Sequence, residues 1–177
     1  PLINHGHQHF GENKVQEAQE KWTSLKNDFP NLKLHLIGKL QTNKVKFALP
    51  LFDYIHSLDS IKLAEKISLE QQKKNFKPKI FIQINIGKEN QKSGIDEDKL
   101  ENFYRKCVSE YNLNIIGIMC LPPFDEDPTP FFKKMQNISE SLNLKEISMG
   151  MSNDYMEALK FKATYIRVGS KIFGSRT

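Results

Sequence analysis

Cysteine, arginine and long apolar runs are all scarce in this chain of 177 residues. The two cysteines, Cys107 and Cys120, lie far apart in apolar stretches, which predicts reduced, buried thiols and excludes a disulfide framework or a cysteine-based zinc site. No apolar run approaches the roughly 20 residues of a membrane-spanning helix. The opening residues also lack the basic and apolar segments of a signal peptide. We therefore expect a cytoplasmic protein without a membrane partner.

Basic residues outnumber acidic ones by 26 to 21, which gives a net charge of +5. A nucleic-acid-binding protein would gather such an excess into one basic stripe. Here the arginines are limited to Arg105, Arg167 and Arg176, and the lysines are spread beside glutamates, as in Glu65-Lys66. This pattern predicts a solvated, lysine-rich surface, so we expect no nucleic-acid partner.

Strand-like and helical segments alternate along the whole chain without a linker or repeat between them. With 38% hydrophobic residues, the length suits one domain over residues 1–177. The expected strands are Phe10–Asn13, Lys33–Ile37, Tyr54–His56, Ile80–Ile86, Ile115–Cys120, Glu146–Met149 and Thr164–Val168. The expected helices are Val15–Asp28, Lys44–Ala48, Ile61–Lys74, Glu97–Glu110, Pro130–Leu142 and Asn153–Lys162, with N-caps at Ser60, Asp96 and Thr129.

This alternation predicts an α/β fold. The segment Ile80–Ile86 is apolar almost throughout, as expected of a parallel strand covered by helices. An open doubly wound sheet and a (β/α)₈ barrel both alternate in this way, but a barrel needs eight strands and the chain offers seven candidates. Either the sheet is open, or the first strand of a barrel is missing before residue 1.

Small residues follow two consecutive expected strands near the end of the chain. In the first turn, Ser148, Gly150 and Ser152 would direct hydroxyls and backbone N–H groups into one space ahead of a helix. In the second, Gly169 would let a ligand approach the backbone and Ser170 would add a hydroxyl. The loops after the last two strands of (β/α)₈ enzymes recurrently bind phosphate. The pair predicts a phosphate-bearing ligand; alternatively, Ser152 is only an N-cap and Gly150 only a turn residue.

Arg167 lies inside an otherwise apolar expected strand, two residues before Gly169 and therefore on the same face. A buried guanidinium needs an acceptor. Either Arg167 addresses the ligand whose phosphate lies just beyond it, or it forms a structural ion pair with an acidic side chain such as Glu12.

Amides and histidines also lie at or near expected strands. Asn43 suits a turn, whereas Asn85 is harder to explain as a structural residue. His5, His7 and His9 alternate but lack a carboxylate or thiol beside them, so we expect no metal site. The remaining histidines, His35 and His56, are expected to be packed and hydrogen-bonded.

A series of short motifs runs in order along nearly the whole chain, from Gly6 to Arg176. They are Gly6–Asn13, Val15–Glu17, His35–Gly38, Leu40–Lys44, His56–Asp59, Gln83–Ile86, Lys92–Ile95, Gly117–Met119, Ser148–Ser152, Arg167–Ser170 and Ile172–Gly174. In these motifs the chain resembles the pyridoxal phosphate homeostasis protein family.

The resemblance implies a TIM-type (β/α) barrel like the N-terminal domain of alanine racemase. It also implies binding of pyridoxal 5′-phosphate (PLP) in vitamin B6 and amino-acid balance, without established catalytic turnover. Arg167 would face the pyridine nitrogen and Asn13 would lie near the ring, with no metal and no catalytic residue. The phosphate would be held by Ser148, Met149, Gly150, Ser152, Gly169 and Ser170, where the family usually has threonine at the last position.

One departure from the family concerns the lysine that anchors PLP as a Schiff base near the end of the first strand. Neither that strand nor that lysine is found in the 177 residues. We expect either that an upstream segment carries both, or that the chain binds PLP or inorganic phosphate weakly and without a covalent link. Lys39 and Lys44 match other positions of the family and are not candidates.

An arginine can only donate hydrogen bonds, so Arg167 would leave the pyridine nitrogen unprotonated and make PLP a weaker electron sink. Racemases with a similar arginine add an acid/base tyrosine from a second domain, which this chain would lack. We therefore expect a monomeric PLP carrier in intracellular PLP homeostasis, without substantial turnover and with PLP-dependent enzymes as candidate recipients. The alternatives are a PLP-dependent amino-acid racemase-like enzyme and a nucleic-acid-binding module.

Overall fold

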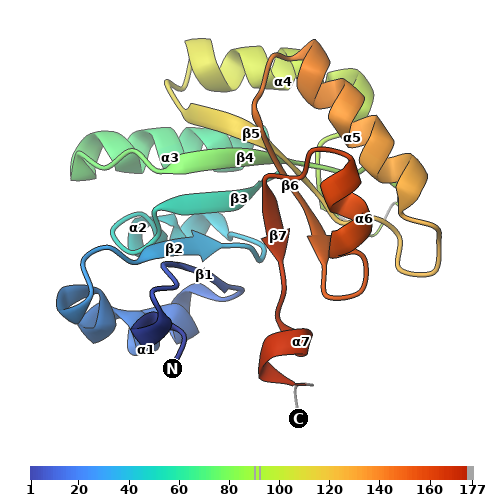
Figure 1. Ribbon diagram of the computed structural model, residues 1–177. Coiled ribbons are helices and arrows are strands. Elements are labelled where there is room, and N and C mark those ends of the chain that lie inside the picture. The colour runs from blue at the N-terminus through green and yellow to red at the C-terminus, as the bar shows by residue number, and fades with distance from the viewer. Residues whose placement is uncertain (90, 92, 175–177) are drawn as a thin grey trace.

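Seven parallel strands form one sheet in which every strand pairs with its neighbours in chain order (Figure 1). The computed structural model describes residues 1–89, 91 and 93–174, so Lys92 and Arg176 of the sequence analysis lie outside the described residues. The strands are β1 (His9–Glu12), β2 (Lys33–Leu36), β3 (Tyr54–Leu58), β4 (Lys79–Ile84), β5 (Asn114–Cys120), β6 (Glu146–Met151) and β7 (Tyr165–Arg167). All seven expected strands are confirmed, with ends shifted by a few residues.

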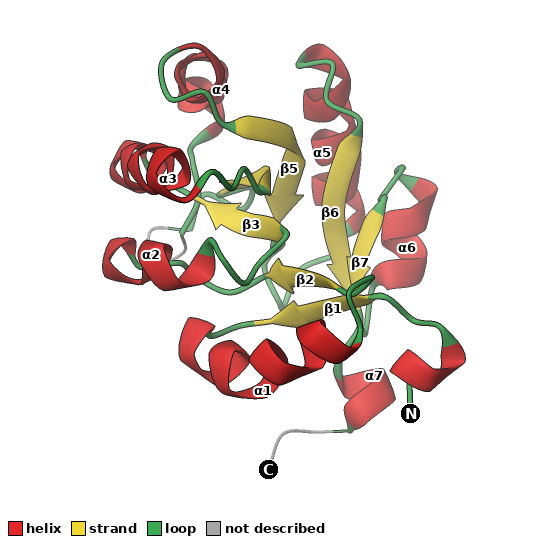
Figure 2. Cartoon of the chain, turned by 90° about the vertical axis from the view of Figure 1, so that its left-hand side faces the viewer, coloured by secondary structure: helices red, strands yellow, loops and turns green. Residues whose placement is uncertain are grey.

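Helices follow the strands and lie outside the curled sheet (Figure 2). They are α1 (Val15–Asp28), α2 (Val45–Ala48), α3 (Ile61–Lys74), α4 (Glu97–Ser109), α5 (Thr129–Ser141), α6 (Tyr155–Lys160) and α7 (Ser170–Phe173), with short 3₁₀ turns η1 (Ile3–His5) and η2 (Thr42–Lys44). Among the described residues, no helix is both long and apolar enough to cross a bilayer.

The sheet curls into an incomplete barrel. The ring of Tyr165 on β7 lies 5.6 Å from that of His35 on β2 and 5.7 Å from that of Tyr54 on β3. These strands are far apart in the pairing order, so only a curled sheet brings the rings together. A doubly wound sheet is excluded because its strand order would reverse. Among the described residues, β1 and β7 are each paired on one side and do not pair with each other.

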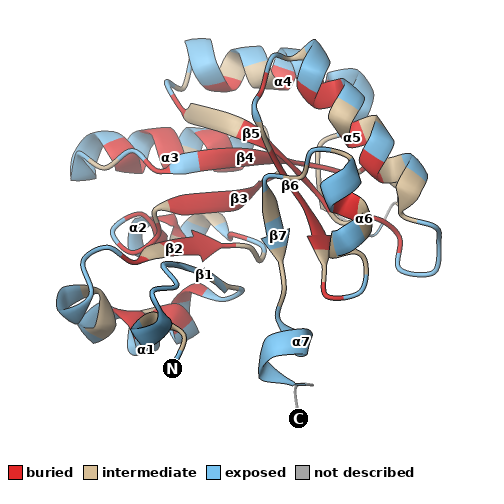
Figure 3. Ribbon diagram, in the orientation of Figure 1, coloured by how far each residue is buried: buried red, intermediate tan, exposed pale blue. Residues whose placement is uncertain are grey.

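Apolar side chains form two layers, one on each side of the strands. Figure 3 shows β3 and β4 as buried along most of their length. The large outer layer packs the sheet against the helices and includes Ile55 and Ile82, both fully buried. The alternate positions Tyr54 and Phe81 belong to a second cluster with Met119 inside the barrel. This division follows the two-residue period of a strand, which sends successive side chains to opposite faces.

The helix ends confirm one expected N-cap and correct another. Ser60 caps α3, since its Oγ accepts a hydrogen bond from the backbone of Leu63 at 3.3 Å. Thr129 is not the cap of α5 but its first residue, and the carboxylate of Asp127 accepts both its N–H and its hydroxyl. Asp96 occupies the N-cap position of α4 without a capping bond from its side chain.

Both cysteines are buried free thiols, as expected. Burial raises the pKa of Cys107 and of Cys120 to about 12. Neither thiol is therefore a nucleophile at neutral pH.

Candidate functional site

The turn that follows β6 is shaped by Gly150 and Asp154. Gly150 has a φ of +89°, and a Cβ at this position would lie 2.7 Å from Cβ of Ala158 on α6. Asp154 is the N-cap residue of α6, and its carboxylate accepts the N–H of Met151 at 2.6 Å. Ser152 is therefore not the N-cap of this helix, and that structural explanation for the residue is wrong.

The turns after β6 and β7 lie against each other. The backbone N–H of Gly169 donates to Oγ of Ser152 at 3.2 Å, and Met151 is in register with Arg167. A Cβ placed on Gly169 would meet no atom within 4 Å, so the backbone there is open to an incoming group. Ser170 is exposed at the start of α7. The structure thus brings together the two turns that the sequence suggested as partners.

Arg167 joins three strands. Its Nη1 donates to Oγ of Ser148 on β6 at 2.6 Å, and its Nη2 donates to the carbonyl oxygen of Cys120 on β5 at 2.8 Å. Desolvation lowers the pKa of this half-buried guanidinium from its ordinary value, but arginine keeps its charge at neutral pH. These contacts fix the guanidinium at the carboxyl end of β5.

The expected alternative for Arg167, an ion pair with Glu12, is wrong. The carboxylate of Glu12 instead accepts hydrogen bonds from Nε1 of Trp22 at 2.6 Å and from Nζ of Lys21 at 2.8 Å. Arg167 donates to a hydroxyl and a carbonyl rather than to a carboxylate. Neither of these two acceptors is an anion, so they do not neutralise the positive charge of Arg167.

A cavity of about 370 Å³ opens at the carboxyl ends of the strands, and Arg167 is not among the residues that line it. Leu121 lines it and directly follows Cys120, whose carbonyl binds Arg167. Ser152 and Gly169 do not line it either, and the contact of Arg167 with the carbonyl of Cys120, next to Leu121, connects the two turns to its edge. The lining residues, which include the amides of Asn13 and Asn85, are Asn13, Ile37, Gly38, Lys39, Gln83, Ile84, Asn85, Gln91, Ser93 and Leu121.

Other residues suggested by the sequence lie elsewhere or act through their backbone. Asn43 lies in η2 and borders a separate surface depression with Lys62 and Lys66 of α3. The side chain of Met149 belongs to the outer core, which leaves only its backbone for ligand contact. Within the described residues, no group of three or more metal-ligating side chains is arranged to hold a metal ion.

Ser148 is fully buried, and its hydroxyl is the end of a chain of histidines inside the barrel. Its Oγ lies 2.9 Å from Nδ1 of His56, whose Nε2 lies 2.9 Å from Nδ1 of His35. Nε2 of His35 lies in turn 2.9 Å from Nδ1 of His9. The expectation that His35 and His56 are packed and hydrogen-bonded is confirmed, but their connection to Arg167 through Ser148 was not anticipated.

Burial keeps these imidazoles neutral. Desolvation lowers the pKa of His35 to about 3, with the neighbouring His9 adding to the effect. Desolvation, His35 and the charge of Arg167 lower the pKa of His56 well below its ordinary value. The chain of rings therefore carries no charge at neutral pH.

Comparisons with known proteins agree with this geometry. The family model "Alanine racemase, N-terminal domain" matches residues 1–177. The pyridoxal phosphate homeostasis protein of Aquifex aeolicus is 36% identical over 184 residues, covering 99% of this chain and 80% of the relative. The human protein of that name is 35% identical over 194 residues, covering 97% and 70%.

Solved structures show the same fold. PipY of Synechococcus elongatus is 35% identical, and 97% of this chain matches 84% of it with a TM-score of 0.91 without PLP and 0.89 with PLP bound. An alanine racemase from Clostridium difficile, 13% identical with a TM-score of 0.75 over 99% of this chain and 47% of that one, shares the fold alone. The expected barrel of the alanine racemase N-terminal type is confirmed.

Proposed function

The chain belongs to the pyridoxal phosphate homeostasis protein family, and from that premise we propose how its barrel holds PLP and what it does with it. As its resemblance to the family predicted, it is a PLP-binding protein of PLP homeostasis. Which of its residues form the site is our proposal.

The phosphate is assigned to the paired turns. Gly169 offers open backbone beside the hydroxyl of Ser152, which is the single observation that carries this assignment. Consecutive backbone amides and small hydroxyls form the kind of concave site that binds phosphate. Gly150 and the backbone of Met149 shape the first turn, and Ser170 adds an exposed hydroxyl to the second.

The ring is assigned to the space between Arg167 and Asn13. The guanidinium can only donate, so it holds the pyridine nitrogen in its unprotonated form. Ser148 contributes by holding the guanidinium, because its own hydroxyl is buried against Arg167 and His56. Asn13 lines the cavity, whose volume of about 370 Å³ suits a small aromatic ligand. These contacts are all noncovalent.

A carrier role follows from this arrangement. PLP supplies an electron sink for carbanions at the α-carbon of amino acids, and a donor to its ring nitrogen weakens that sink. Arg167 therefore favours retention of the cofactor over turnover. The relatives carry names of homeostasis proteins rather than of enzymes, and the likeness to alanine racemase extends to the fold alone. A monomeric, cytoplasmic carrier that hands PLP to PLP-dependent enzymes stays a prediction.

The test is retention of PLP after gel filtration, measured by absorbance, for the wild type and matched variants. We expect Arg167→Gln and Ser152→Ala to reduce PLP affinity by about tenfold or more. Arg105→Gln is the matched control, since Arg105 is an exposed helical residue paired with Glu101. Ser109→Ala controls for the serine, because Ser109 is exposed and bonded to its own helix.

The result that would contradict the site is unchanged PLP affinity in both Arg167→Gln and Ser152→Ala. The carrier role has its own test, incubation of the PLP-loaded protein with L-alanine or L-serine. Inversion of either amino acid at enzymatic rates would favour the racemase-like alternative.

A further inference from the structure

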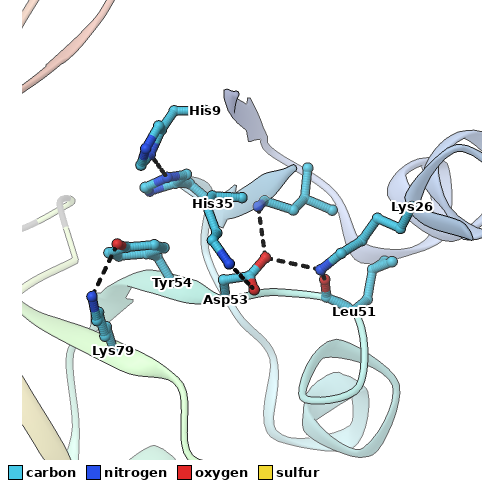
Figure 4. A network of polar contacts seen from close by, with 9 residues as sticks. His9, Lys26, His35, Leu51, Asp53, Tyr54 and Lys79 are labelled. Carbon is cyan, nitrogen blue, oxygen red and sulfur yellow. Dashed lines mark hydrogen bonds and ion pairs between the residues drawn. The ribbon is translucent and has the colours of Figure 1, made fainter. Parts of the chain in front are cut away.

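The chain of histidines inside the barrel ends on the residue that holds the arginine. His9, His35 and His56 come from β1, β2 and β3, and each ring lies 2.9 Å from the next polar atom in the series. Figure 4 shows the first step, between His9 and His35, beside the stacked ring of Tyr54. Ser148 and Arg167 complete the series on β6 and β7.

The donors and acceptors in this series allow its hydrogen bonds to run in one direction only, away from Arg167. Arg167 has no acceptor, so Oγ of Ser148 must accept its N–H. The hydroxyl of Ser148 can then donate its single hydrogen bond to Nδ1 of His56. A neutral imidazole that accepts at Nδ1 carries its own proton at Nε2. His56 therefore donates to Nδ1 of His35.

The same rule carries the pattern one step further. His35 accepts at Nδ1, so its proton is on Nε2 and is donated to Nδ1 of His9. In the reverse direction His56 would donate to Ser148, which already accepts from Arg167. The hydroxyl proton of Ser148 would then be buried without an acceptor among the described residues, which is unfavourable.

The rings that make up this series are held rigidly. His35 stacks on Tyr54 with centroids 4.1 Å apart and planes 12° apart. His56 stacks on Phe81 at 4.2 Å and 20°. Tyr165 lies edge-on to His56 at 5.9 Å. Stacked rings cannot turn to exchange partners without losing these contacts, so each histidine keeps its place in the series.

We propose that Arg167 imposes the Nε2–H tautomer on His56 and His35, and that these two histidines act as positioning residues for Arg167 through Ser148. By accepting a hydrogen bond from the hydroxyl of Ser148, Nδ1 of His56 orients a lone pair of Ser148 toward Nη1 of Arg167 and so fixes the guanidinium. The effect on PLP rests on the proposed function, in which Arg167 faces the pyridine nitrogen. The tautomers themselves do not depend on it.

The charged and titratable groups around the rings are consistent with neutral histidines. His35 is near His9, Asp53 and Lys79, and His56 is near His35 and Arg167. Asp53 is itself held by Lys26 at 2.8 Å and by the N–H of Leu34 at 2.8 Å (Figure 4). Burial and the neighbouring cations together disfavour a proton on either ring.

The first test reads the tautomers directly, by long-range ¹H–¹⁵N correlation spectra of the ¹⁵N-labelled protein without added PLP. We expect His56 and His35 to carry their protons on Nε2 at neutral pH. Ser148→Ala should remove the preference at His56 and bring its two nitrogen shifts closer together. Ser139→Ala, which removes another buried serine hydroxyl, bonded to the carbonyl of Leu144, should leave them unchanged. A proton on Nδ1 of His56 or His35 in the wild type would overturn the proposal.

The second test separates positioning from packing. Asparagine at position 56 can present an acceptor where Nδ1 lies, whereas phenylalanine fills the space without one. We expect His56→Phe to lose PLP affinity by about tenfold and His56→Asn to recover most of it. Equal affinity of the wild type and His56→Phe would overturn the positioning role. If the wild type itself bound no PLP, the proposed function would fail, while the tautomer result would still decide the inference.

Discussion

The backbone N–H of Gly169 lies 3.2 Å from Oγ of Ser152, so the turns after β6 and β7 share one hydrogen bond. This contact places the open backbone of one turn beside the hydroxyl of the other. We proposed that the phosphate of PLP binds at this contact, and that proposal predicts different effects for substitutions of Gly169 and of Gly150.

Replacing Gly169 by alanine should weaken PLP binding without affecting the fold. Its φ is −120°, and an added Cβ meets no atom within 4 Å. We expect the free energy of unfolding to change by less than about 0.5 kcal/mol. PLP affinity should fall by about tenfold, because the methyl group would occupy the space of the phosphate. Urea unfolding and a PLP fluorescence titration measure the two effects, and unchanged affinity would argue against a phosphate here.

Replacing Gly150 by alanine should, in contrast, destabilise the fold. A side chain at its φ of +89° is strained, and the new Cβ would lie 2.7 Å from that of the fully buried Ala158. We expect a loss of about 1–3 kcal/mol in the free energy of unfolding. Urea unfolding of Gly150→Ala and of Gly169→Ala measures the difference between their free energies of unfolding. Equal stability of the two variants would mean that the turn after β6 relaxes freely.

The N-caps of α3 and α4 offer a second pair. Ser60→Ala should lower the free energy of unfolding by about 1 kcal/mol, because Oγ of Ser60 satisfies the N–H of Leu63. Asp96→Ala should change stability little, since the side chain of Asp96 makes no capping bond and, among the described residues, forms an ion pair with the exposed Lys99 alone. Thermal unfolding of both variants measures the difference. Equal losses would show that Asp96 caps α4 in solution.

Much of the barrel was predictable because its signals are local. The alternation of apolar residues located every strand, and small residues after Met149 and Arg167 marked the two turns. The cap of α5 was misplaced by one residue because Thr129 is a good capping residue ahead of a proline, whereas the helix begins at Thr129 and Pro128 occupies the N-cap position. Asp127, one residue earlier, accepts the hydrogen bonds of Thr129.

The histidine chain was not predictable as a unit because it depends on lateral register. His35 and His56 lie on the neighbouring strands β2 and β3, and they meet because the register of this pair places both on the inward face. Only the curl of the sheet brings Ser148 of β6 to His56. One signal was present, namely polar rings at the inward parity of two strands that are otherwise apolar. The cavity was missed for a related reason, since Lys39, Gln83 and Ser93 come from segments with no shared sequence pattern.

Acid should destabilise the fold well above the range in which carboxylates titrate. The pKa of His35 is lowered from 6.5 to about 3, and that of His56 is lowered as well. Above pH 6.5 these histidines are neutral in both the folded and the unfolded chain. As the pH falls below 6.5, the unfolded chain takes up their protons while the folded chain does not, so stability present at neutral pH is lost. For His35 the loss continues down to about pH 3.

Each such histidine should contribute a slope of about 1.4 kcal/mol per pH unit once the pH is well below 6.5. Urea unfolding of the wild type at intervals from pH 7.5 to about pH 5 measures this slope before aspartate and glutamate begin to titrate. His35→Gln removes one titrating group. It should therefore reduce the slope by the contribution of one proton, about 1.4 kcal/mol per pH unit, whatever its effect on stability at neutral pH. A wild-type stability that stays constant between about pH 7 and pH 5 would mean that the buried rings take up protons in the folded barrel, which the burial of His35 and His56 disfavours.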